Sequence, residues 1–419
     1  MSLVFRNGCE DDVPSFAQVC AHSFPSVGLS PPEWEVSLRD DVRGGVDTLW
    51  IGEEDGGEED GGVVAGCRLF RYQQWISGVR MPMTGLSTVA ISATHRRRGL
   101  AGDLVATGLR EARATGDAVS ALYPFRTSFY HRLGYGMSGE VRQYRVRPRD
   151  LPDNPARRHV EIADTPEARA DIPSIYDRWV PAQTGQVVRG RRAWELVWQQ
   201  DTRHAAIYRA DPDRATGYVV FRYLTDDRRG GRAIDVEEIV WLDPAARAAL
   251  YGWLASLADQ WDFILYRAHP EESFVEFLRE LCYPAEGIPP WHSWFPTSNV
   301  LAGPMFRILD VERAWGERRV DPEWSLTLAL ELHDPQIPEN EGEWTLRLDE
   351  GRVHVRRGAS GPADLRLALP IDVLSRIFIG ALAPSAAVMA GLADVVGTAP
   401  VLALDRALRL PLPWTFDRF

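Results

Sequence analysis

The stretch from Leu86 to Gly136 restricts the fold of this chain most strongly, because it joins a strand to a helix through a basic, glycine-containing turn. Residues 86–91 are mostly apolar or β-branched and predict a strand, and residues 104–114 carry apolar side chains at helical spacing. The turn reads Thr-His-Arg-Arg-Arg-Gly-Leu-Ala-Gly over residues 94–102. Because the first N–H groups of a helix have no partner within it and glycine allows close approach, such a turn can bind a diphosphate.

The glycine spacing separates this turn from other nucleotide-binding turns. It has neither the G-x-x-x-x-G-K-[ST] sequence of a P-loop nor the G-x-G-x-x-G sequence of a dinucleotide site. It has Arg96-x-x-Gly99-x-Ala101 instead, in which arginine can add charge-assisted hydrogen bonds to phosphate oxygens. Taken alone, the same pattern also fits a solvated helix cap.

Length and charge limit what the rest of the chain can be. With 419 residues it is expected to form two or three domains. The net charge of −12 argues against binding nucleic acid or an anionic membrane and favours cationic or neutral partners. The four cysteines have no metal-site spacing, so we expect no metal and no disulfide framework. Because no apolar run approaches the roughly 18 residues of a membrane span and no signal peptide is evident, we expect a cytoplasmic protein.

A second motif strengthens the interpretation of the turn. An apolar strand at residues 119–123 is followed by Phe-Tyr-His-Arg-Leu-Gly-Tyr-Gly at residues 129–136. Together the two motifs resemble the acetyl-coenzyme A (acetyl-CoA) loop and the tyrosine-bearing segment of the GCN5-related N-acetyltransferases. They are most similar to those of the enhanced intracellular survival (Eis) family. The resemblance implies acetyl-CoA as co-substrate, and a Tyr130 that faces the departing sulfur and protonates it. By itself, a tyrosine at this position would fit a core residue better.

The resemblance also assigns coenzyme binding to the strand before the turn, to the turn itself and to the start of the second motif. An amide of the strand is expected to polarise the thioester carbonyl while the strand pairs with the pantetheine arm. The assigned residues are Val89, Ala90, Ile91, Arg96, Arg97, Arg98, Gly99, Leu100, Ala101, Gly102, Phe125 and Arg126.

The end of the sequence is unusually aromatic. Residues 412–419 read Leu-Pro-Trp-Thr-Phe-Asp-Arg-Phe, and such a segment is expected to be docked on the protein. In the Eis family the C-terminal aromatic residue enters the active site and its α-carboxylate acts as the base, and Phe419 matches that position. A carboxylate with an ordinary pKa of ~3.5 lies far below an alkyl ammonium at ~10.4, so attracting and orienting the amine is its more secure contribution. The alternative is that Phe419 only anchors the terminus.

The acceptor is expected to be a small cationic amine or a peptide lysine, and the resemblance implies polyamine-like molecules such as aminoglycosides. Its pocket should be wide and acidic. Phe24, Trp34 and Asp417 are the candidate acceptor contacts, although helix packing or surface charge explains each of them equally well. The acidic, glycine-rich run at residues 53–62 is expected to be a solvated hairpin tip.

The domain organisation follows from the order of these patterns. We expect an α/β (α+β) chain with a catalytic acetyltransferase domain at residues 1–150 and a degenerate acetyltransferase-like domain at 151–297. In the second domain residues 217–223 echo 66–72, but Asp243-Pro-Ala-Ala-Arg247 replaces the coenzyme turn and would repel phosphate. Strands followed by helices at residues 298–419 resemble a sterol carrier protein type 2 domain. The family implies a homohexamer.

A function of another class stays open at this point. The last third of the chain could make the protein a lipid- or sterol-binding carrier, although this leaves Arg96 to Gly102 unexplained. Nucleic-acid binding through the three arginines is disfavoured by the net charge and by the lack of a wider basic patch.

Overall fold

The computed structural model describes residues 3–54, 62–199, 202–211, 214–226, 230–281, 297–359 and 361–419. The chain divides into two compact units. The first contains residues 1–139, 184–193 and 304–419, and the second contains residues 140–183 and 194–303. The expected hairpin tip falls largely on residues 55–61, which lie outside the described residues, as does Cys282.

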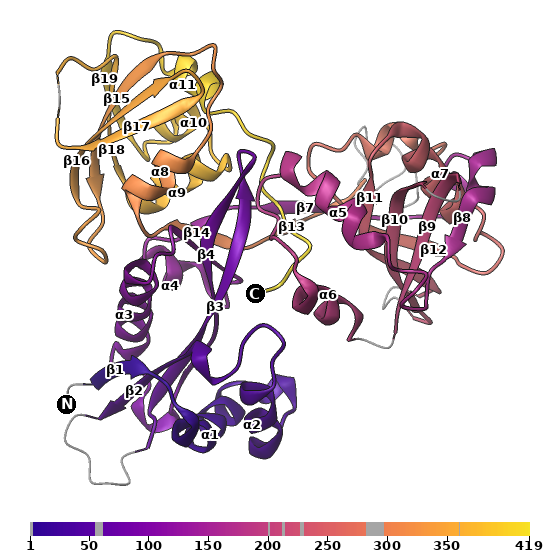
Figure 1. Cartoon of the computed structure of the whole chain (residues 1–419), viewed down its shortest axis with the longest axis horizontal. Helices are drawn as coiled ribbons and strands as arrows, with labels where there is room; N and C mark the ends of the chain where they lie inside the picture. The colour runs from indigo at the N-terminus through magenta and orange to yellow at the C-terminus, as the bar shows by residue number, and fades with distance from the viewer. Residues whose placement is uncertain are drawn as a thin grey trace, which may run out of the picture. The chain divides into compact units, whose positions relative to one another are not determined.

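The first unit is built on a seven-stranded sheet of order β1-β2-β3-β4-β5-β14-β6 (Figure 1). Neighbouring strands are antiparallel except for β4 and β5, which run parallel and are connected through α3. The strands are β1 (Leu3–Asn7), β2 (Leu49–Glu54), β3 (Ala65–Ile76), β4 (Val79–Ile91), β5 (Val119–Leu122), β6 (Gly136–Met137) and β14 (Met305–Ile308).

Helices cover both faces of this sheet. Successive side chains of β3 point to opposite faces, so the helices that they contact identify which helix covers which face. Gly66 of β3 faces α1, because an added Cβ would lie 2.4 Å from the ring of Phe16. Leu69, an odd number of positions further on, faces Gly108 of α3. The helices are α1 (Val13–Ser23), α2 (Pro31–Arg39), α3 (Leu100–Ala114) and α4 (Thr127–His131). Helix α3 therefore begins at Leu100, earlier than its apolar periodicity indicated.

The last third of the chain forms a five-stranded sheet of order β17-β16-β15-β18-β19 with four helices (Figure 1). Its core is continuous with that of the first sheet, since Phe306 of β14 stacks on Phe378 of α9 with centroids 6.0 Å apart. The elements are α8 (Val311–Glu317), β15 (Leu326–His333), β16 (Gly342–Asp349), β17 (Arg352–Arg357), β18 (Leu365–Pro370), α9 (Ile371–Ile379), α10 (Pro384–Met389), β19 (Asp394–Gly397) and α11 (Val401–Ala407).

The second unit has its own seven-stranded sheet, of order β13-β7-β12-β11-β10-β9-β8. Its strands are β7 (Glu140–Val146), β8 (Val160–Ile162), β9 (Arg203–Asp211), β10 (Arg214–Leu224), β11 (Ala233–Trp241), β12 (Phe263–Ala268) and β13 (Asn299–Ala302). The helices in this part of the chain are α5 (Ile172–Trp179), α6 (Arg191–Trp198) and α7 (Pro244–Ala255), and the first residues of α6 belong to the first unit.

The strands do not divide between the sheets at the boundaries expected from the sequence. β7 precedes residue 150 but lies in the second sheet, so the chain leaves the first sheet at Gly139. β13 lies after residue 298 and also belongs to the second sheet, whereas β14 returns to the first sheet between β5 and β6. Alternating apolar residues predict a strand but not its neighbours, which explains the difference.

A buried ion pair connects β14 to the last third of the chain. Arg307 of β14 lies 2.7 Å from a carboxylate oxygen of Asp334, and neither side chain is exposed. Asn340 donates to the same carboxylate, and Arg307 donates to the carbonyl of Leu133 at 2.6 Å. Gly134 has φ +83°, and an added Cβ would overlap the guanidinium of Arg307. This glycine of the second motif is therefore required by packing.

No helix in the described ranges is long and apolar enough to cross a membrane.

The Arg307–Asp334 pair generates a stability prediction. Asp334→Ala should lower the free energy of unfolding by about 3–5 kcal/mol, because it leaves a buried guanidinium without its counter-charge. Urea denaturation measures this change. Asp349→Ala is the matched control, since its partner Arg347 is largely exposed and such surface pairs contribute about 1 kcal/mol or less. Equal losses in the two variants would contradict the role given to burial.

Candidate active site

The turn before α3 is open on the side where a phosphate would approach. Gly99 precedes the helix with φ +86°, and no side chain caps the helix. A Cβ added to Gly99 or Gly102 would meet no atom within 4 Å. Within the described ranges the N–H groups of Leu100 and Ala101 donate to no acceptor, whereas that of Gly102 donates to the carbonyl of Gly99. The residues present therefore fit a diphosphate group.

The arginines of the turn are exposed and only loosely bound. Arg98 donates to the carbonyl of Thr94 at 3.1 Å, and Arg96 approaches the carbonyl of His22 at 3.4 Å. Arg97 has φ +63° and makes no ion pair with any residue that the structure describes. His95 instead lies 2.7 Å from Glu54 of β2 and fixes the base of the turn. The guanidinium groups can therefore reorient toward a bound anion.

The strand before the turn has a free edge. The parallel ladder between β4 and β5 ends at the pair Gly85–Ala121, so that residues 86–91 pair only with β3 in the described part of the chain. A bulge interrupts β4 at Thr88, whose φ of +52° is unfavourable for a β-branched residue and costs on the order of 1–3 kcal/mol. The free edge includes Val89, Ala90 and Ile91, and offers backbone hydrogen bonds to an extended ligand.

The corresponding helix of the second unit is closed to phosphate. Asp243 caps α7, and its side chain accepts a hydrogen bond from the N–H of Ala246 at 2.8 Å. A carboxylate therefore occupies the helix end that Gly99 leaves open in α3. This geometry gives a physical basis for the expected degeneracy of the second domain.

Tyr130 lies on α4, which follows β5. It is 3% exposed, and its ring contacts Phe125, Phe129 and Tyr135. Among the described residues its hydroxyl has no hydrogen-bond partner. Burial raises the pKa of Tyr130 above its usual value, and the nearby Cys67 adds to the shift. The phenol is therefore neutral near pH 7 and can donate a hydrogen bond.

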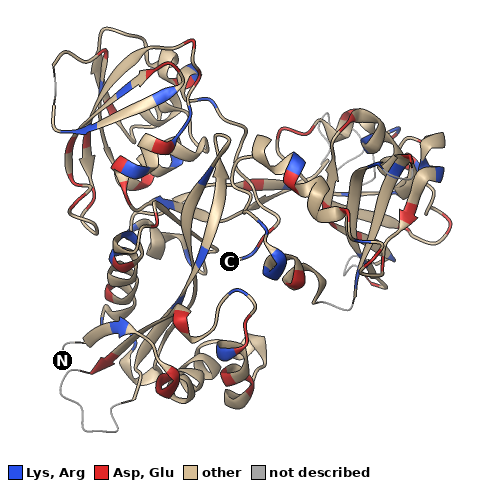
Figure 2. Cartoon of the chain, in the orientation of Figure 1, with Lys and Arg blue, Asp and Glu red and all other residues tan. Residues whose placement is uncertain are grey.

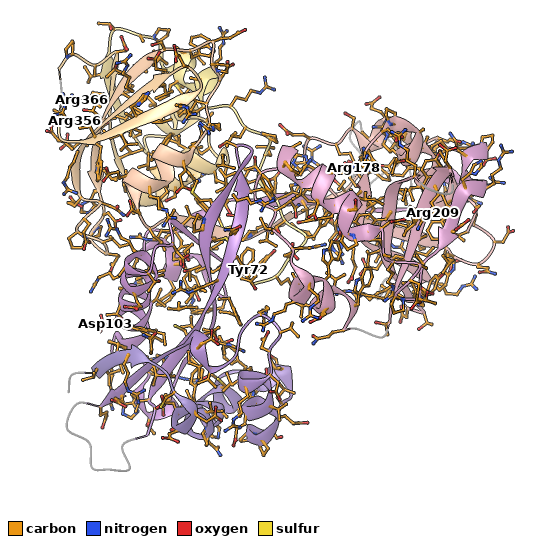
Figure 3. The ribbon with its side chains drawn as sticks, in the orientation of Figure 1. Tyr72, Asp103, Arg178, Arg209, Arg356 and Arg366 are labelled. Atoms are coloured by element: carbon orange, nitrogen blue, oxygen red, sulfur yellow. The ribbon has the colours of Figure 1, made fainter. Side chains whose placement is uncertain are left out.

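The aromatic end of the chain is docked, as expected. Phe419 is 5% exposed, and its ring lies between Tyr72 of β3 and Tyr123, with centroid distances of 5.9 and 5.4 Å. A Cβ added to Gly85 would lie 2.8 Å from the Cβ of Phe419. Phe419 therefore packs on the last pair of the β4–β5 ladder. Tyr72, which Figure 3 labels on β3, contacts the last residue of the chain.

The segment that follows β5 contacts both of the expected catalytic residues, Tyr130 and Phe419. Tyr123 contacts Phe419, and Phe125 contacts Tyr130 with centroids 5.5 Å apart. Phe125 itself is 71% exposed, and Arg126 beside it is also exposed, so both are accessible to a ligand.

The three expected acceptor contacts have protein partners. Asp417 accepts a hydrogen bond from Arg189 at 2.9 Å, so its carboxylate is paired with a cation of the protein. Phe24 and Trp34 contact each other with centroids 5.8 Å apart and belong to the apolar core of α1 and α2. Within the described residues the ring contacts of Phe419 involve neither of them.

The face of β3 next to Phe419 carries balanced charge. Arg43 lies 4.2 Å above the ring centroid of Phe70 and 2.7 Å from Asp41, which also pairs with the buried Arg68. Burial raises the pKa of Tyr72 to about 12. Acidic and basic residues are interspersed around α1 and α2 (Figure 2). This differs from the acidic surroundings expected for the acceptor.

Sequence reasoning missed Gly85, Tyr72, Tyr123 and Arg189. The first three are ordinary strand residues in the sequence, and only the docked terminus distinguishes them. Arg189 has no sequence signal at all, because its importance comes from contact with a residue far along the chain.

Comparison with known proteins gives a consistent result. Models of the acetyltransferase (GNAT) domain match residues 5–138 and 185–285, and a sterol carrier protein domain model matches residues 311–415. The N-acetyltransferase Eis of Mycobacterium tuberculosis is 25% identical over 91% of this chain and 90% of its own length. Crystal structures of a GCN5-related N-acetyltransferase from Anabaena variabilis (20% identity, TM-score 0.83) and of Eis1 from Mycobacterium abscessus (19%, 0.76) align over 100% of both chains.

These matches, together with the open turn and the free β4 edge, define the class as GCN5-related N-acetyltransferases, enzymes whose co-substrate is acetyl-CoA. The predicted fold class, with two acetyltransferase domains and a sterol carrier protein domain, is confirmed. The similarity to Eis extends over almost the whole chain at 25% identity, which supports an N-acetyltransferase of the Eis type.

The contrast between α3 and α7 generates a binding prediction. Gly102→Asp should fold normally, because the position is open and an acidic residue is favourable in the first turn of a helix. The new carboxylate should repel the pyrophosphate and weaken acetyl-CoA binding by about tenfold or more, measured by titration calorimetry. Gly102→Ala is the uncharged control. Unchanged affinity in the aspartate variant would exclude this turn as the phosphate site.

Proposed function

We propose that this enzyme transfers the acetyl group of acetyl-CoA directly to a primary amine, with the Phe419 carboxylate as base and Tyr130 as acid. The observation that carries the proposal is the position of Phe419. It packs at Gly85, where the free edge of β4 begins, and its α-carboxylate makes no ion pair or hydrogen bond with any described residue. A carboxylate placed there can receive a cationic amine.

Coenzyme binding is proposed for the groups expected from the sequence. The free edge of β4 at Val89 to Ile91 pairs with the pantetheine arm. The helix N-terminus at Gly99 to Gly102 binds the pyrophosphate, and Arg96, Arg97 and Arg98 add charge. Phe125 and Arg126 are accessible to the rest of the coenzyme. When bound, acetyl-CoA supplies an activated acetyl thioester.

The carboxylate of Phe419 first attracts and orients the ammonium group. Its proton affinity in water is far too low to deprotonate that group. Proton transfer within the pair therefore requires that both charged groups be removed from water, because the loss of solvation disfavours each charged form. When the coenzyme A sulfur departs, the hydroxyl of Tyr130 donates a hydrogen bond to it as negative charge develops there. The hydroxyl then transfers its proton to the sulfur.

The acceptor classes proposed are polyamine-like cations, including aminoglycosides, and lysine side chains of peptides. The net charge of −12 and the terminal carboxylate favour cations over anions. Phe24 and Trp34 are proposed as apolar contacts of the acceptor. The alternative function, a lipid carrier, is disfavoured because apolar side chains of the last domain pack on one another in a core, as Phe306 and Phe378 do.

The experiment that tests the acceptor class is a thiol-release assay with acetyl-CoA across polyamines, aminoglycosides and lysine peptides. Mass spectrometry of the products then gives the number of acetyl groups added. If coenzyme binds but no amine releases thiol, the proposed acceptor class is rejected. The proposal includes a cytoplasmic homohexamer, as the family resemblance implies, which analytical ultracentrifugation would test.

The substitution Tyr130→Phe tests whether Tyr130 is the general acid of the reaction. It should lower kcat by about 10²-fold, because the general acid is lost, and should leave acetyl-CoA affinity unchanged. Because burial raises the pKa of this phenol, kcat of the unaltered enzyme should not fall through its ionisation between about pH 7 and about pH 9. An alkaline decrease in that range that disappears in Tyr130→Phe would contradict a neutral phenol. Steady-state kinetics over this pH range measure both effects.

The terminal carboxylate is tested by moving it without removing the ring. Adding one glycine after Phe419 should lower kcat by about 10²-fold through misplacement of the carboxylate, while acetyl-CoA binding survives. Phe419→Leu is the matched control, because it keeps the carboxylate and shortens only the packing group. If the extended chain keeps full turnover and Phe419→Leu loses it, Phe419 is a packing anchor and the carboxylate leaves the mechanism.

A further inference from the structure

The tail that ends in Phe419 is held by a short segment from the middle of the sequence. Residues 184–189 lie beside β3, where Gly185 donates to the carbonyl of Trp75 at 2.8 Å and Trp75 donates back to Gln186 at 2.7 Å. Val188 donates to the carbonyl of Gln73 at 2.8 Å. These backbone hydrogen bonds fix the segment to the strand that also carries Tyr72.

The same segment contacts the tail at intervals. Trp414 donates its N–H to the carbonyl of Thr184 at 3.0 Å, and Phe416 donates its N–H to the side chain of Gln186 at 3.2 Å. Arg189 donates to both carboxylate oxygens of Asp417, at 2.9 and 3.2 Å. The contacts therefore follow the tail to within two residues of its end.

The contact between Arg189 and Asp417 is the best placed to fix the position of the chain end, because both side chains are largely buried. The side chain of Arg189 is 1% exposed and that of Asp417 is 15% exposed. On the other side, the hydroxyl of Tyr123 donates to the carbonyl of Asp417 at 2.9 Å. Asp417 is thus fixed through both its side chain and its backbone, which restricts where the carboxylate of Phe419 can lie.

We propose that Arg189 is a positioning residue for the reaction, which sets the place of the Phe419 carboxylate by holding Asp417. The inference rests on the catalytic role proposed for Phe419. Arg189 also neutralises Asp417, so that the incoming ammonium is attracted by the terminal carboxylate and not by a second acid beside it. The segment is flanked in the chain by residues of the second unit, but it belongs to the first unit, as does the tail that it holds.

A double-mutant cycle on the full-length enzyme tests this proposal. Arg189→Gln should lower kcat by about tenfold or more without changing KM for acetyl-CoA, because only carboxylate placement is affected. Arg189→Lys, which keeps the charge, should recover part of the loss. In chains that lack Phe419, Arg189→Gln should cause no further decrease, since the group that it positions is absent. Arg347→Gln is the control, an exposed arginine that also pairs with an aspartate.

The outcomes separate this proposal from the one before it. If deletion of Phe419 leaves kcat unchanged, the carboxylate mechanism fails. If deletion lowers kcat but Arg189→Gln does not, or if the two losses multiply, Arg189 does not act through the terminus and only this proposal fails. Should Arg189→Gln not fold, Asp417→Ala removes the same contact from the side of the tail, with the same expected loss of kcat and the same non-additivity with Phe419 deletion.

Discussion

The candidate active site depends on the position at which β4 and β5 stop pairing with each other. After the pair Gly85–Ala121, the backbone groups of β4 have no neighbouring strand on that side within the described part of the chain. Buried backbone N–H and C=O groups that lack partners are costly, so an edge of this kind is suited to a ligand that supplies them. The segment that follows β5 contacts both Tyr130 and Phe419, which are the proposed acid and the residue that carries the proposed base.

In the two acetyltransferase domains, one residue at the start of the helix decides whether the helix end is open or closed to phosphate. Both have a parallel strand pair connected through a helix. Gly99 leaves the N-terminus of α3 uncapped, whereas Asp243 caps α7 with its own carboxylate. A carboxylate already hydrogen-bonded at a helix N-terminus competes with phosphate for the same N–H groups. The second domain keeps the sheet and the helix but closes the helix end to phosphate.

Packing also explains residues that a motif alone would assign to catalysis. An added Cβ at Gly134 would overlap the buried guanidinium of Arg307, and one at Gly136 would lie 2.4 Å from the side chain of Arg376. Both glycines therefore allow the last third of the chain to approach the first sheet. The same approach gives the two parts a continuous core, and the C-terminal tail completes it with Phe419.

Local chemistry in the sequence determined the open glycine turn before α3, the tyrosine after β5, the capped turn of the second domain and the order of the three domains. Glycine conformation, helix capping and apolar periodicity act over a few residues, so the sequence shows them directly. Only the tertiary structure decided that β7 and β14 join sheets outside their expected domains, that Asp417 is paired and that Arg189 reaches it. Those outcomes depend on contacts between residues hundreds of positions apart, and strand partners and buried ion pairs leave no periodic signal in the chain.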